Sequence, residues 1–135
     1  MAIFALTSEV VTINSVDYSD HCKSATLTVD AANLDVTDFA SAGWVEALGG
    51  LKSGTLSVEF HDDFAASDLD SEMWALLGTV TTFLVRPTSA VVGTSNPNYT
   101  GSILITGHSV GGSVGEVASK SLSFPTSGAI TRATA

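Results

Sequence analysis

The sequence is poor in cysteine, in basic residues and in long apolar runs. Its 135 residues include a single cysteine, Cys22, so the chain can form no intramolecular disulfide and no cysteine-based structural zinc site. Five basic residues stand against 14 acidic ones, and the resulting formal net charge of −9 repels phosphate. No apolar run approaches the roughly 20 residues of a membrane-spanning helix. We therefore expect neither a disulfide-stapled domain, nor a basic nucleic-acid binder, nor a membrane partner.

The composition is typical of one small domain that covers residues 1–135. Apolar residues make up 44% of the chain. A domain of this length buries roughly two-thirds of its extended-chain surface, which sustains a core without metals or disulfides. Residues 1–10 carry no basic residue and only a short apolar run, so no signal peptide is predicted. We expect the chain to be made in a cytoplasm.

Alternation of apolar and polar residues predicts strands with one solvated face. It is clearest where Leu56, Val58 and Phe60 alternate with polar residues, and it recurs over residues 26–30. Weaker strand patterns lie at residues 10–14, 122–124 and 129–134.

Two other segments, residues 80–85 and 102–105, place apolar side chains on both faces. This pattern predicts strands that are covered on both sides. Clusters of glycine, proline, asparagine and serine predict turns or loops between the strands. They lie at residues 14–15, 49–50, 87–89, 96–98 and 111–112.

A single short helix is predicted at about residues 68–77. Ser67 or Asp68 can cap its beginning, and Gly78 can end it. Trp74 on this helix is expected to pack into the core. About seven short strands and one helix predict a mainly β fold, a sandwich or barrel of two packed sheets with one flanking helix.

Residues 31–54 follow no regular period and are interrupted by glycines. They carry several acidic and apolar side chains, namely Asp35, Asp38, Phe39, Trp44 and Leu48. A long irregular loop with exposed apolar groups is more often functional than incidental. Trp44 either covers the sheet from this loop or anchors a contact with another chain, a role in which tryptophan is enriched.

The segment from Gly107 to Gly111 matches the G-x-S-x-G nucleophile motif of serine hydrolases, with Ser109 as the nucleophile. That motif needs an acidic residue and then a histidine later in the chain, and no histidine follows Ser109. We therefore expect a flexible connection between strands rather than a hydrolase, and no enzymatic activity.

Metal binding is also not expected. His61, Asp62 and Asp63 are consecutive, and successive side chains of a strand point to opposite faces. The acidic run from Asp68 to Glu72 lacks the glycine of a calcium-binding loop and suits a helix start better. No metal and no cofactor is predicted.

Several short strings, in their order and spacing, extend over nearly the whole chain. They include Val11-Thr-Ile-Asn14, Leu48-Gly-Gly-Leu-Lys52, Trp74-Ala-Leu-Leu-Gly-Thr79, Asn96-Pro-Asn-Tyr-Thr-Gly101 and Gly128-Ala-Ile-Thr-Arg-Ala-Thr134. Together they resemble the major tail, or tail tube, proteins of long-tailed bacteriophages. No single string is diagnostic, and the order carries the resemblance.

The resemblance implies a tail-tube-type β-sandwich whose copies close into hexameric rings. The rings stack into the tube through which genome DNA leaves the capsid. In the family a long loop between early strands reaches the next ring, and residues 31–54 match it. This makes Asp35, Asp38, Phe39, Trp44 and Leu48 candidate inter-ring residues.

The implied location is the phage tail of a virion, after synthesis in the host cytoplasm. The implied partners are other copies of the chain and the tape measure, tail terminator and distal tail proteins, while DNA passes without specific binding. Two alternatives stay open: another virion component, such as a tail terminator or head decoration protein, and a serine hydrolase that uses Ser109.

Two carboxylates are candidates for the wall of the channel. By alternation, Asp30 points away from the face of Leu27, and Glu59 points away from the face of Val58 and Phe60. Both side chains therefore face either the outside of a tube or its channel. An acidic wall would not hold DNA, so we predict that Asp30 or Glu59 faces the channel.

Overall fold

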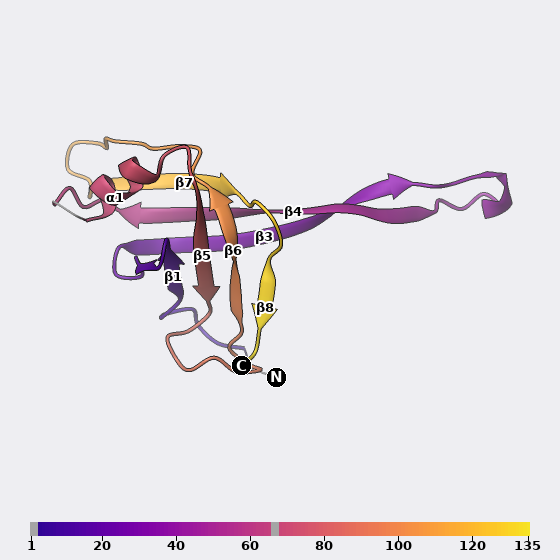
Figure 1. Ribbon diagram of the computed structural model, residues 1–135, viewed down its shortest axis with the longest axis horizontal. Helices are drawn as coiled ribbons and strands as arrows, with labels where there is room; N and C mark the ends of the chain where they lie inside the picture. The colour runs from indigo at the N-terminus through magenta and orange to yellow at the C-terminus, as the bar shows by residue number, and fades with distance from the viewer. Residues whose placement is uncertain (1–2, 66–67) are drawn as a thin grey trace.

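The computed structural model describes residues 3–65 and 68–135, which form eight strands, one α-helix and one short 3-10 helix (Figure 1). In chain order these elements are β1 (Val10–Ile13), β2 (Val16–Asp17), β3 (Cys22–Asp35), η1 (Phe39–Ser41), β4 (Ala47–His61), α1 (Leu69–Leu76), β5 (Val80–Arg86), β6 (Asn98–Leu104), β7 (Ser119–Pro125) and β8 (Thr131–Ala133).

The strands form two antiparallel sheets. One has five strands in the order β2-β1-β5-β6-β8, and the other has three in the order β3-β4-β7. In Figure 1 the strands of the five-stranded sheet run across those of the three-stranded sheet, as in orthogonal sheet packing. An isolated bridge between Ile103 and Thr126 links the two sheets. The predicted mainly β fold of two packed sheets with one short helix is confirmed.

The core lies between the sheets and follows the alternation of the strands. Leu56, Val58 and Phe60 of β4 are buried because alternate side chains of a strand share one face. The other buried apolar residues are Val11, Ile13, Tyr18, Leu69, Met73, Phe83, Val85, Ile103, Ile105, Leu122 and Phe124. The strands predicted at residues 10–14, 122–124 and 129–134 are present as β1, β7 and β8.

Helix α1 closes one end of the sandwich. Asp68 is its N-cap, and its side chain accepts a 2.9 Å hydrogen bond from the Leu69 N–H. The alternative cap, Ser67, lies outside the described residues. Leu69 and Met73 are fully buried under the helix. Within residues 3–65 and 68–135, no helix is long and apolar enough to cross a membrane.

Two predictions about burial are wrong: that Trp74 packs into the core, and that the strand at residues 80–85 is covered on both faces. Trp74 is 63% exposed, because it follows the buried Met73 by one position and so points away from the core. In β5, only the face of Thr81, Phe83 and Val85 is buried, whereas Val80 is 57% exposed. Among the described residues, nothing fully covers the outer face of this strand.

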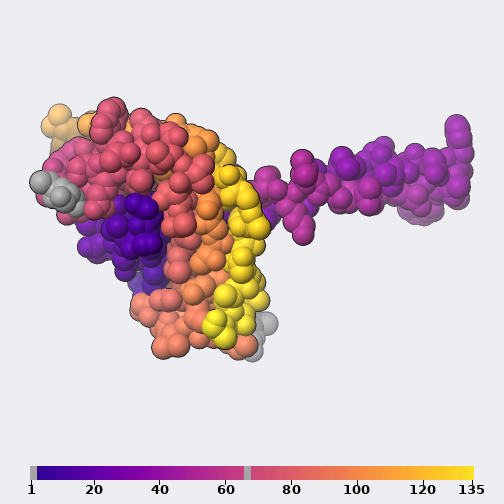
Figure 2. Space-filling view, in the orientation of Figure 1, coloured from indigo at the N-terminus to yellow at the C-terminus, as the bar shows by residue number. Residues whose placement is uncertain are grey.

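The prediction of an irregular loop over residues 31–54 is also wrong. Strands β3 and β4 continue through this stretch as a long hairpin, and Leu34 pairs with Leu48 near its end. Gly49 and Gly50, predicted as a turn, lie inside β4. The hairpin projects from the body as a thin arm (Figures 1 and 2). Its residues are solvated on both faces, so no alternation marked it as strand.

Gly54 lies where the arm joins the body, and the fold has no room for a side chain there. A Cβ at this position would lie 2.9 Å from Ile130 Cδ1 and 3.0 Å from the Thr28 carbonyl oxygen. We predict that Gly54→Ala lowers the free energy of unfolding by about 1–3 kcal/mol, the usual effect of overpacking. Chemical denaturation measures it.

Gly49→Ala is the matched control, because it lies in the same strand and a Cβ there meets nothing within 4 Å. Equal stability of the two variants would contradict the close packing of Gly54.

Candidate functional site

The arm, residues 31–52, has a tip with a defined structure. The Asp38 side chain caps η1 by accepting a 3.0 Å hydrogen bond from the Ala40 N–H, and the Asp38 N–H donates to Ser41 Oγ. Asp35 accepts a 2.9 Å hydrogen bond from the Thr37 N–H, and bonds from Thr37 hold the pKa of the Asp35 carboxyl below its usual range. These carboxylates hold the backbone of the turn through hydrogen bonds, so the apolar side chains around them are not needed for its structure.

The arm exposes an unusual amount of apolar surface. Phe39 is fully exposed, and Trp44 and Val45 are 78% and 83% exposed. These three residues line a hollow at the tip together with Thr37, Asp38 and Gly43. Single exposed apolar residues are ordinary, but a contiguous patch marks an interaction site.

All five residues predicted for this site lie on the arm, from Asp35 to Leu48. Phe39, Trp44 and Leu48 are exposed, so the alternative that Trp44 covers the sheet is wrong. Sequence reasoning missed the exposed Val45 and Leu51, because nothing in their spacing separated them from core residues of a strand.

The outer face of the three-stranded sheet forms a second candidate surface. Pairing of β3 with β4 and of β4 with β7 places the same kind of side chain side by side along three strands. We call this surface the hydroxyl face; its members are Ser24, Thr26, Thr28, Thr55, Ser57, Ser121 and Ser123. Ser57 and Ser123 contact each other through their hydroxyls at 3.1 Å.

Asp30 and Glu59, the two predicted channel residues, lie on this same side of the sheet. Asp30 pairs with Ser53, and Glu59 pairs with Ser24 and Ser121. Glu59 is half-buried and lies 3.7 Å from the Lys23 ammonium. The face is therefore polar, built from small side chains and weakly charged.

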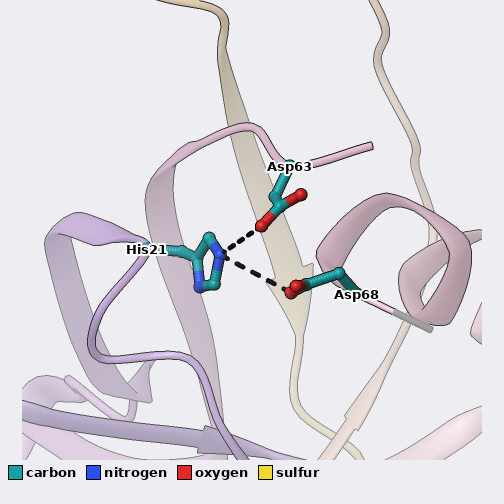
Figure 3. A group of neighbouring side chains, drawn as sticks. All are labelled: His21, Asp63 and Asp68. Carbon is teal, nitrogen blue, oxygen red and sulfur yellow. Dashed lines mark hydrogen bonds and ion pairs between the residues drawn. The ribbon is translucent and has the colours of Figure 1, made fainter. Parts of the chain in front are cut away.

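A third group joins the turn before β3 to the start of α1 (Figure 3). His21 Nε2 lies 3.0 Å from Asp63 Oδ2 and 3.5 Å from Asp68 Oδ1, while its Nδ1 lies 2.9 Å from Asp20. The hydrogen bond to Asp63 raises the pKa of His21, against the opposing effect of burial. The hydrogen bonds that Asp63 accepts from the Ala65 N–H and from His21 lower the pKa of Asp63.

His21, Asp63 and Asp68 are also the kind of side chains that hold a metal ion, with one ligand atom each within 4.8 Å of one another. However, Asp63 also accepts a hydrogen bond from the Ala65 N–H, and Asp68 caps α1. Hydrogen bonds of the His21 ring to the carboxylates on either side account for this arrangement without an ion. Of the predicted run, Asp62 and Asp63 turn to different partners, Lys120 and His21, so they do not converge.

This ion pair predicts a pH-dependent stability. Because the folded pKa of His21 is raised, its contribution is complete below the unfolded value of about 6.5 and is lost as the pH rises through the folded pKa. The pair also loses its stabilising effect at acid pH, below about pH 4, where Asp63 becomes protonated despite its lowered pKa. The stability lost in His21→Gln should therefore be larger near pH 5.5 than near pH 8.5.

Denaturation of both proteins at the two pH values measures this difference. His61→Gln is the matched control, because His61 is exposed. A stability loss in His21→Gln that does not change with pH would contradict the ion pair.

The hydrolase alternative gains no support from the geometry. Ser109 is exposed in the connection between β6 and β7, and within the described residues its hydroxyl makes no hydrogen bond to a histidine. His108, its neighbour, faces Asp70 at 3.1 Å instead.

Of the comparisons with known proteins, the one with solved structures found similar folds. No protein-family profile and no curated protein matches the chain. A chain in the virion of a native gene transfer agent particle is similar over 93% of this chain and 95% of its own, with a TM-score of 0.74 and 21% identity. A chain in the tail of an empty gene transfer agent particle, refined helically with C6 symmetry, is similar over 82% of this chain and 81% of its own, with a TM-score of 0.66 and 24% identity. At these identities the likeness shows a shared fold.

Proposed function

We propose that this chain is a structural subunit of a phage-type tail and polymerises as stacked rings into the tail tube. The observation that carries the proposal is the arm, whose apolar tip has no cover from its own body. An arm that reaches beyond the body and binds a different surface of the next copy makes a head-to-tail contact, which repeats as an open filament when its rotation does not close a ring. Such a contact produces a filament along the direction of stacking.

The similar fold of chains in a gene transfer agent virion and in a tail with C6 symmetry supports this proposal and favours rings of six. The uncovered outer face of β5 suits contacts with neighbouring copies. The expected partners beyond the chain itself are the tape measure, tail terminator and distal tail proteins.

The hydroxyl face is our candidate for the channel wall. Small neutral hydroxyls with an occasional carboxylate offer no cationic row to phosphate, so DNA would pass without being held. On this proposal Asp30 and Glu59 face the channel, and the chain has no enzymatic activity.

Electron microscopy of the purified full chain tests the proposal. We expect tubes with a regular axial repeat and sixfold end views. Closed rings that do not stack would instead favour a tail terminator or head decoration protein, and monomers at all concentrations would contradict self-assembly.

A further inference from the structure

A charged cluster lies inside the body, apart from every surface described above. It joins Lys120 of β7, Asp62 at the end of β4, Asp70 of α1 and His108 of the β6–β7 connection. The side chains of Lys120 and Asp62 are both 0% exposed. Lys120 Nζ lies 3.4 Å from Asp62 Oδ1 and 3.0 Å from Asp70 Oδ1.

The strands bring Lys120 and Asp62 together. Lys120 pairs with Phe60 across β4 and β7, and Asp62 follows Phe60 by two positions, so both side chains point to the core side. The Asp62 N–H donates a 2.8 Å hydrogen bond to the Ala118 carbonyl, which fixes the backbone at this point.

Burial of such a pair is costly unless every polar atom is satisfied. Here Asp62 Oδ2 and His108 Nδ1 are buried without a hydrogen-bond partner among the described residues. The pair is thus closely placed, fully dehydrated and incompletely satisfied. An amide between the two side chains would remove both charges at once.

We propose that Lys120 and Asp62 join in an intramolecular isopeptide bond, with Asp70 as the catalytic group that transfers the protons. Asp70 takes a proton from the Lys120 ammonium, to which it is hydrogen-bonded, and this frees the lone pair of Nζ. Nζ then attacks Asp62 Cγ, and the bond from Cγ to one carboxyl oxygen breaks. An ammonium and a carboxylate thereby become one amide and one water molecule, without an oxidant or any co-reactant.

The contacts of the two Asp62 oxygens indicate which one stays in the amide and which one leaves as water. Oδ1 accepts a 3.0 Å hydrogen bond from the Asp63 N–H and becomes the amide oxygen, with that donor stabilising its developing negative charge. Oδ2 has no partner and leaves as water, taking the two protons that nitrogen loses.

Asp70 is placed to carry these protons because its Oδ1 touches Lys120 Nζ. The hydrogen bond from Lys120 holds the pKa of the Asp70 carboxyl below its usual range, so Asp70 is present as the base. Its side chain is 25% exposed, which leaves a route by which the released water reaches solvent.

Intact-mass measurement of the denatured full chain tests the proposal. The expected mass is below that of the sequence by one water molecule. Trypsin cleaves neither the Arg86–Pro87 bond nor the chain after an acylated lysine, so it should yield one peptide of residues 53–132 that is lighter than its sequence by one water, in place of the separate peptides 53–120 and 121–132. Lys120→Arg keeps the positive charge but lacks the amine nucleophile, so it should show its full sequence mass.

Asp62→Asn is the sharper control, since an amide side chain reacts with the same amine but releases ammonia. Its mass should therefore fall by one ammonia rather than one water, which separates this bond from dehydration elsewhere in the chain. Asp70→Asn should stay folded by circular dichroism and show a much slower loss of mass. Full sequence mass and cleavage after Lys120 in folded wild-type protein, after several days at growth temperature, would overturn the proposal.

Discussion

Replacing Phe39 and Trp44 together by serine is expected to abolish tube formation and leave the body folded. Both side chains lie at the tip of the arm, outside the core, and both are largely exposed. Aromatic anchors at the centre of an interface each contribute about 2 kcal/mol or more to binding. In the proposed tube their loss would be repeated at every contact between rings, so assembly should fail even at high protein concentration. Electron microscopy and sedimentation measure tubes, and circular dichroism and thermal unfolding measure the fold.

Val91→Ser is the control for this change. Val91 is 91% exposed but lies in the connection between β5 and β6, away from the arm, so tubes should form normally. Tubes of wild-type stability in the double serine variant would contradict an inter-ring role for the tip. Unfolding of that variant would instead assign both aromatic residues to the stability of the fold.

The sequence reveals those parts of the fold in which burial is one-sided. The alternation at Leu56, Val58 and Phe60 predicted a strand correctly, because one face of β4 packs on the core and the other is solvated. The helix was also predicted correctly, because Asp68 supplies a cap and Leu69 and Met73 form its buried side. In both cases local chemistry and tertiary packing agree.

The arm could not be predicted as strand for the opposite reason. Within the described part of the chain, its two strands pair only with each other and leave both faces in solvent, so apolar residues there follow no period. Gly49 and Gly50 suggested a turn, although their backbone conformation is extended within β4. The residues predicted for the contact nevertheless lie on the arm and are exposed, and their role in a contact stays a prediction.

The cluster around Lys120 lies beyond sequence reasoning altogether. Lys120 and Asp70 are 50 residues apart in the chain and meet only because α1 covers the end of β7. A lysine between serines reads as a solvated position of a strand, and its full burial depends on the packing of the helix. Trp74 is the opposite case. Its size predicted a buried residue, but its position on the helix leaves it exposed.

Changing Asp30 and Glu59 together to lysine is expected to make assembled tubes retain DNA. Both positions lie on the hydroxyl face, and neither contributes to the core, so tubes should still form. Two cations per subunit, repeated around every ring, would give a passing duplex many phosphate contacts. With about 6–10 such contacts engaged, affinity should fall by roughly 10³–10⁵ between 50 and 200 mM salt. Retention in low salt and release in high salt, followed by gel analysis of tubes mixed with short duplexes, measure the effect.

The location of the bound DNA decides the interpretation of this experiment. Duplex held in the channel should resist added nuclease, whereas duplex bound outside the tube should be digested. Val91→Lys is the matched control, because Val91 is exposed in the connection between β5 and β6, away from the hydroxyl face and the arm, so any DNA that it attracts should be digested. A second control, Asp30→Ser with Glu59→Ser, removes the acids without adding cations and should retain no DNA. Digestible DNA on the double lysine variant would place the hydroxyl face on the outside of the tube, and the channel would then be lined by another surface of the subunit.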